Sequence, residues 1–185
     1  TGVETEHSGS GTTGDYFEYT VTVPSGTVLA RFDLDSIDDG ADLDLTVYQL
    51  DSSGTPIAGW QSATGSADER VDIANPDAAE YLVYVDIYSA NPTTAFDFRT
   101  YSVLAAGEPV GLSPAVLPGQ QGIPLTFTAT WSGLQAHSSY LGIISYGDTG
   151  AQTFLSVTTG EVVLPGTPIN TSPPTITGTV QVGKK

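Results

Sequence analysis

The stretch DYFEYTVTVPSGTVLARFDLD, residues 15–35, decides the fold class. Apolar side chains occupy every second position of residues 17–23 and again of residues 28–34, and most positions between them are polar. A period of two is typical of a half-buried β-strand. Pro24, Ser25 and Gly26 separate the two runs and predict a turn. The stretch therefore predicts two strands that each bury one face.

The same alternation recurs along the chain, and no stretch carries a helical period over a useful length. We therefore predict an all-β protein. About seven or eight strands before residue 107 predict a jelly-roll β-sandwich. Fewer strands follow, and they predict a small second β domain with a thin core. The further strands are expected over residues 42–48, 69–73, 81–88, 94–104, 125–131, 140–146 and 153–158.

The charge of the chain is strongly negative. Its 185 residues include 21 acidic and five basic side chains, a net charge of −16, and 18 of the acids precede residue 108. Nucleic acid is excluded as a partner because phosphate binding depends on Lys and Arg, and anionic membrane surfaces are disfavoured for the same reason. Such a surface either keeps a secreted protein soluble or supplies oxygen ligands to hard cations.

Cysteine and methionine are both missing from the chain. The lack of cysteine excludes disulfides, thiolate metal sites and a cysteine nucleophile. No apolar run approaches the roughly 20 residues that span a bilayer, and no signal peptide is present. Because the sequence starts at Thr1 without a methionine, we expect it to be an internal piece of a longer polypeptide.

A domain boundary is predicted at residues 107–109, where the acidic composition ends. The Gly- and Ser-rich residues 8–14 resemble a flexible connection and lack the Lys of a phosphate-binding loop. The second domain either packs on the first or is completed by strands upstream of Thr1. The predicted organisation is a lead-in linker (1–14), a jelly roll (15–106), a second β domain (107–164) and a linker into a further repeat (165–185).

Four ordered segments carry a family resemblance: residues 15–21, 29–34, 41–48 and 79–85, with the sequences DYFEYTV, LARFDL, ADLDLTVY and AEYLVYV. In order and spacing they resemble the bacterial pre-peptidase C-terminal domain, a β jelly roll appended to secreted proteases. The resemblance covers residues 12–104.

The second half resembles the fibronectin type III-like region that closes many bacterial subtilisin-like peptidases, through residues 113–115, 125–134 and 140–146. Residues 173–180 resemble the start of an immunoglobulin-like repeat. These resemblances imply a jelly roll followed by a small immunoglobulin- or fibronectin III-like domain. They also imply a secreted, extracellular parent serine protease whose catalytic domain precedes Thr1, so the fragment itself is expected to be no enzyme.

An acidic loop around Gly40 is the first candidate site. Ca²⁺ takes six to eight hard oxygens, which such a loop could supply in part, but the spacing does not match an EF-hand because Ile37 occupies the third position. Some members of the resembled family bind Ca²⁺ and many do not. Two interpretations are open, a Ca²⁺ site and plain solvated carboxylates; a glycosidase pair lacks any sign of a cleft. The carboxylates concerned are Asp35, Asp38, Asp39, Asp42, Asp44 and Asp86.

Aromatic residues are the second candidate site. Trp60 is expected in a loop, and Tyr48, Tyr84 and Tyr88 are expected on outer strand faces. Exposed aromatics on a β surface stack on sugar rings or on peptides. Trp131 falls on the apolar face of its strand and is expected in the core.

No catalytic constellation is predicted. His7, in the lead-in stretch, and His137, in a turn, are both expected to be exposed loop residues, and neither has the nucleophile context of a Ser-His-Asp triad. Two functions are therefore expected. One is a non-catalytic accessory module that stabilises, positions or helps to secrete the parent protease. The alternative is a module that binds polysaccharide or protein and targets the enzyme to an insoluble substrate or cell surface.

Overall fold

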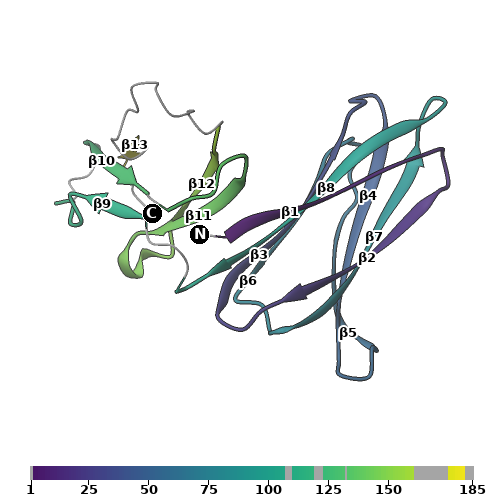
Figure 1. Ribbon diagram of the computed structural model, residues 1–185, viewed down its shortest axis with the longest axis horizontal. Helices are drawn as coiled ribbons and strands as arrows, with labels where there is room; N and C mark the ends of the chain where they lie inside the picture. Colours follow the sequence, from purple (N-terminus) through teal and green to yellow (C-terminus); the bar gives the residue numbers. More distant parts are fainter. Residues whose placement is uncertain (1, 107–109, 119–122, 132, 161–174, 182–185) are drawn as a thin grey trace.

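The structure is a computed structural model that describes residues 2–106, 110–118, 123–131, 133–160 and 175–181 (Figure 1). It is all-β, as the alternation predicts, and every strand pair is antiparallel. No helix in the described part is long and apolar enough to cross a membrane.

The first eight strands form a jelly roll of two sheets. One sheet has the order β1-β8-β3-β6 and the other has the order β2-β7-β4-β5, so successive strands switch between sheets along much of the chain. The predicted turn at residues 24–26 carries the chain from one sheet to the other. The first sheet contains β1 (Gly2–Gly11), β3 (Thr27–Ser36), β6 (Glu69–Ala74) and β8 (Thr94–Leu104); the second contains β2 (Tyr16–Val23), β4 (Asp42–Leu50), β5 (Pro56–Ser62) and β7 (Ala79–Ser89).

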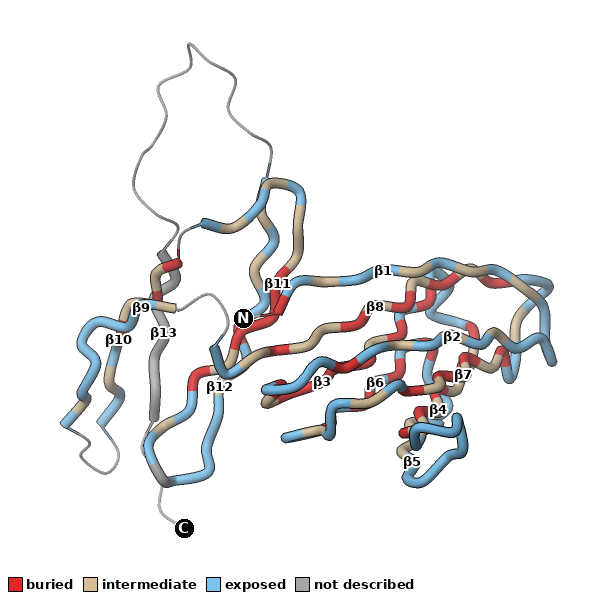
Figure 2. Tube along the Cα trace, turned by 60° about the horizontal axis from the view of Figure 1, so that its bottom comes forward, coloured by how far each residue is buried: buried red, intermediate tan, exposed pale blue. Residues whose placement is uncertain are grey.

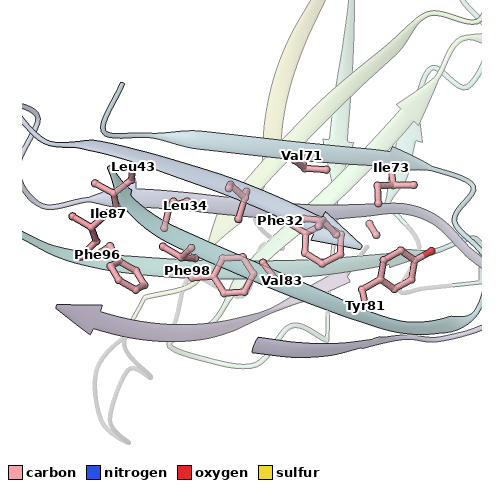
Figure 3. Close-up of a cluster of buried hydrophobic side chains, with 14 of the residues drawn as sticks. Phe32, Leu34, Leu43, Val71, Ile73, Tyr81, Val83, Ile87, Phe96 and Phe98 are labelled. Carbon is pink, nitrogen blue, oxygen red and sulfur yellow. The ribbon is translucent and has the colours of Figure 1, made fainter. Parts of the chain in front are cut away.

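The core lies between these two sheets (Figure 3). Central strands supply it, and buried residues alternate with partly exposed ones along β4 and β7 (Figure 2). Each buried Leu or Phe contributes about 1.5 to 3 kcal/mol relative to its exposed state. The largest fully buried side chains here are Phe32, Leu34, Leu43, Leu45, Tyr81, Ile87, Phe96 and Phe98.

The prediction of a flexible linker over residues 1–14 is wrong, because β1 occupies Gly2–Gly11 and pairs with β8 from Glu4 to Gly11. The glycines are needed for close packing. A Cβ on Gly9 would lie 2.4 Å from the ring of its cross-strand partner Phe96. An aromatic ring covers the glycine in place of a side chain, and the Gly-rich composition therefore conceals a strand.

The second domain contains two small sheets. One has the order β13-β10-β9, and the hairpin of β11 and β12 faces it across a core that includes Phe127, Trp131 and Leu155. Trp131 is therefore a core residue, as predicted. The strands are β9 (Gly111–Ser113), β10 (Pro124–Thr130), β11 (Ser139–Ser145), β12 (Gln152–Thr158) and β13 (Thr175–Gln181).

The structure describes only part of the two predicted connections, residues 107–109 and 165–185. Residues 165–185 were expected to be a linker, but residues 175–181 form β13, which pairs along the whole of β10; residues 161–174 and 182–185 lie outside the described residues. The boundary at residues 107–109 also lies outside them, between the end of β8 and the start of β9.

The two domains share a sheet at their junction. Gly2 and Val3 of β1 pair with Leu141 and Tyr140 of β11, which extends the first sheet to six strands. Leu29 of β3, Val103 of β8 and Leu141 of β11 form a small buried cluster at this junction. The second domain therefore packs on the first, and its completion by strands upstream of Thr1 stays a prediction.

Candidate binding face

The outer face of the four-stranded sheet carries aromatic and acidic side chains in a regular array. On β2, β4 and β7 the residues that alternate with the buried ones point to solvent. The strand register sets them in rows. One row runs Tyr16, Asp86, Asp44, and the next runs Glu18, Tyr84, Thr46, Gln61. We call this surface the tyrosine face and define it by Tyr16, Glu18, Asp44, Tyr48, Tyr84 and Asp86.

Tyr84 lies at the centre of the tyrosine face. Its ring centroid is 6.3 Å from that of Tyr16 and 6.2 Å from that of Tyr48, which it meets edge to face. Gly59 on β5 lies opposite Tyr48, and a Cβ at that position would come within 3.1 Å of the tyrosine ring. The absence of a side chain on β5 therefore leaves room for the Tyr48 ring.

The predicted outer positions of Tyr48, Tyr84 and Tyr88 are confirmed. Tyr88 is 68% exposed near the end of β7 and lies beyond the array. Tyr16, which is 61% exposed, was not among the predicted site residues. The alternation predicts that Tyr16 points to the face opposite Phe17. It does not predict that Tyr16 pairs with Asp86 of β7, which is what brings Tyr16 next to Tyr84.

The prediction for Trp60 is wrong in its placement. Trp60 belongs to β5, and its half-buried ring packs on the edge of the core with its centroid 6.2 Å from that of Tyr81. Its orientation follows from the strand period, which turns residue 60 inward and its neighbours outward. Trp60 therefore packs against the core side of the four-stranded sheet and is not part of its outer face.

Two carboxylates of the tyrosine face, Asp44 and Asp86, have a raised pKa. Partial burial raises the pKa of Asp44 above its ordinary value of 3.8, and the negative charges of Asp42, Asp86 and Glu69 raise it further. Partial burial also raises the pKa of Asp86. Desolvation and the Glu18 carboxylate raise the pKa of Tyr84. Among the described residues, the strands β2, β4, β5 and β7 carry no Lys or Arg that would offset these charges.

The six carboxylates of the predicted Ca²⁺ site do not come together. Asp35 pairs with Arg99 at 2.9 Å on the opposite sheet, and Asp38 accepts a hydrogen bond from the backbone N–H of Gly40 within its own turn. Asp39 is exposed in the same turn. Asp44 and Asp86 lie on the outer side of the four-stranded sheet, and Asp42 begins β4 beside a register irregularity.

Within the described ranges no group of three or more His, Cys, Asp and Glu side chains is arranged to hold a metal ion. One Asp42 oxygen, Oδ1, is buried without a hydrogen-bond partner there, but a single unpaired oxygen is not a coordination shell. The residues present do not fit the expected Ca²⁺ loop, and Ca²⁺ binding stays a prediction.

The two histidines differ in environment. His137 is exposed in its turn, as predicted, with a left-handed backbone at φ 52°. The prediction for His7 is wrong, because it lies in β1 with its ring 5.0 Å from Tyr19 and 6.0 Å from Phe98, centroid to centroid. Its ring therefore packs between Tyr19 of β2 and Phe98 of β8, one from each sheet.

His7 also borders a cleft of about 740 Å³ at the domain junction. The cleft lies between β1, β2 and residues 133–135, and hydroxyl and apolar side chains line most of it. Among the described residues that line it there is no carboxylate, Lys or Arg.

Comparisons with known proteins are sparse. No protein-family model and no curated protein matches the chain. A solved structure of PliG, a periplasmic inhibitor of g-type lysozyme from Aeromonas hydrophila, is similar at a TM-score of 0.38 and 14% identity, over 54% of this chain and 86% of that one.

Two larger structures are also similar. The infectious bursal disease virus structure (Gx strain) has a TM-score of 0.29 and 9% identity, over 57% of this chain and 33% of that one. Dimeric latent PorU from Porphyromonas gingivalis has a TM-score of 0.23 and 10% identity, over 97% of this chain and 22% of that one. Similarities this weak carry no argument about function.

Proposed function

We propose that the chain is a non-catalytic accessory module of a secreted subtilisin-like serine protease, and that it positions the parent enzyme by binding an extracellular polymer through the tyrosine face. The resemblance of four segments to the pre-peptidase C-terminal domain supports the first part. Those segments lie in and around β2, β3, β4 and β7; β3, β4 and β7 each have a neighbouring strand on both sides, and β2 is an edge strand.

The observation that carries the binding role is the cluster of Tyr16, Tyr48 and Tyr84 on one open sheet face. Aromatic rings with a polar end are the side chains that most often anchor interfaces, because they bury a large area and lose little conformational entropy. A face that only had to be soluble would not need three neighbouring rings. Because β1 pairs with β11, a jelly roll bound to a polymer would also hold the second domain near that polymer.

The test is a sedimentation assay of the full 185-residue chain on cellulose, chitin, peptidoglycan and insoluble fibrous protein. We expect one of these to retain the chain, and we expect the double variant Tyr48→Ala/Tyr84→Ala to weaken retention at least tenfold, as for an interface hot spot. Val116→Ala, which trims an 80%-exposed apolar side chain of the second domain, is the control and should change nothing.

Thermal unfolding separates binding from folding. Both tyrosines are half-buried on the outer face and lie outside the core between the sheets, so the double variant should remain folded. Retention of the wild type on none of the polymers would contradict the binding role and favour a role in stability or secretion. Retention that is insensitive to the tyrosines would move binding to another surface.

A further inference from the structure

Charge is segregated between the two faces of the jelly roll. The described residues contain three cationic side chains other than His, namely Arg31, Arg70 and Arg99, and all three lie in the six-stranded sheet on β3, β6 and β8. Each is paired. Arg31 contacts Asp72 at 2.7 Å, Arg70 contacts Asp33 at 2.7 Å, and Arg99 contacts Glu6, Asp35 and Asp97 within 3.1 Å.

The four-stranded sheet has no Lys or Arg on any of its strands β2, β4, β5 and β7. Its outer side nevertheless carries Glu18, Asp44, Glu80 and Asp86, and none of them forms an ion pair within the described part of the chain. The register even sets Asp44 directly opposite Asp86. Like charges directly opposite on neighbouring strands are destabilising.

We propose that the tyrosine face binds an extended, Lys- and Arg-rich polypeptide segment, whose cations stack on Tyr16, Tyr48 and Tyr84 and pair with Glu18, Asp44 and Asp86. The inference rests on the proposed function and names the class of ligand for the same face. Cations over aromatic rings and cations beside carboxylates are both favourable, and here each ring has a carboxylate as its cross-strand or diagonal neighbour.

The spacing of the rings favours a polypeptide. Alternate side chains of an extended chain are about 6.6 Å apart, twice the rise per residue. The centroids of Tyr16 and Tyr48 lie 6.3 Å and 6.2 Å from that of Tyr84. Successive cationic side chains of one extended segment can therefore reach successive rings. A neutral polysaccharide would use the rings and could donate hydroxyl hydrogen bonds to the carboxylates, but it would leave their charge without a counter-ion.

The raised pKa values of Asp44 and Asp86 agree with this assignment, because both carboxylates are partly desolvated and Asp44 also lies near the negative charges of Asp42, Asp86 and Glu69. An arriving cation would lower both values again. Binding should therefore weaken on acidification sooner than ordinary carboxylates would predict.

The experiment measures the anisotropy of a fluorescent 12-residue peptide of alternating Lys and Thr, titrated with the full chain. The double variant Asp44→Asn/Asp86→Asn removes two charges from the tyrosine face. Asp33→Asn/Asp97→Asn removes two charges from the opposite sheet and gives the same net charge, so general attraction to an acidic protein is controlled. We expect the first variant to raise the Kd at least tenfold and the second to raise it less than threefold.

Additional measurements test whether the ligand is a cationic polypeptide. Tyr84→Ala should also raise the Kd at least tenfold, and the affinity should fall when salt is raised from about 50 to 300 mM. Equal effects of the two charge variants would overturn the proposal, as would equal binding of an alternating Ser-Thr peptide. A chitosan oligomer that binds through the same residues while the peptide does not would replace the polypeptide by an amino sugar.

The proposed function can survive if this inference fails. Tyr-dependent retention on a neutral polymer that ignores Asp44→Asn/Asp86→Asn would keep the binding role and reject the cationic ligand. Loss of every Tyr-dependent interaction would reject both.

Discussion

Replacing Gly9 by Ala tests the strand that the sequence concealed. A methyl group at this position would meet Cζ of Phe96 at 2.4 Å and Cε1 at 2.8 Å, whereas ordinary contacts are 3.4 to 4 Å. The ring has little freedom to retreat, since Phe96 is fully buried and packs edge-on against Phe17 with centroids 5.0 Å apart. Either the ring or β1 has to move by about 1 Å, the difference between these distances.

Overpacking of this kind costs about 1 to 3 kcal/mol. A loss near 2 kcal/mol should lower the unfolding temperature by roughly 5 to 10 °C for a domain of this size. Differential scanning calorimetry of the full chain measures it, with Gly65→Ala as the matched control. No atom lies within 4 Å of a Cβ on Gly65, and its backbone is not in the left-handed region.

The unfolding temperature of Gly9→Ala distinguishes a strand at residues 2–11 from a flexible linker. If residues 1–14 were a flexible linker, a methyl group on Gly9 would meet nothing and leave the unfolding temperature unchanged. An unchanged temperature, with Gly65→Ala also neutral, would refute the placement of β1 beside β8. It would also remove the pairing with β11 that joins the domains.

Three further outcomes follow from single side chains. Glu69→Ala should cost about 1.5 to 3 kcal/mol in denaturant unfolding, because the buried carboxylate accepts hydrogen bonds from the Thr64 amide and hydroxyl. Asp44→Asn should raise the unfolding temperature at neutral pH and not at about pH 3, since a raised pKa makes ionisation of Asp44 a cost that grows as pH rises above 3.8. Phe154→Ala should cost about 0.5 to 1 kcal/mol, because it removes the ring stacked 5.0 Å from the Arg31 guanidinium across the domain junction.

Strands with one apolar face could be predicted from the sequence alone. Along β4 and β7 every inward position is apolar or aromatic except Gln49, and the observed bounds differ from the expected ones by at most a few residues. The period of two is strong there because both strands are central and must bury one complete face. Their outer residues, Asp44 and Tyr84 among them, follow from the same alternation.

Edges and partners could not be predicted in this way. In β1 the inward positions include Gly9 and Gly11, because rings and side chains from neighbouring strands fill the space where their own would stand. In β5 all but two residues are exposed, so Trp60 had no apolar pattern around it to indicate a strand. The missing information is tertiary, since each of these segments is defined by what packs against it.

The tyrosine face depends on the core for its geometry. Tyr84 and Asp86 alternate with Val83, Val85 and Ile87 on β7, and each of these three is at most 1% exposed. A shift of one residue in the β7 register would bury the tyrosine and expose the valines, so packing fixes the positions of the outer residues. The rings are therefore held before any ligand arrives, and a ligand pays little to order them. Repulsion between Asp44 and Asp86 is tolerable only because this packing holds their strands together, and a cationic partner would relieve it.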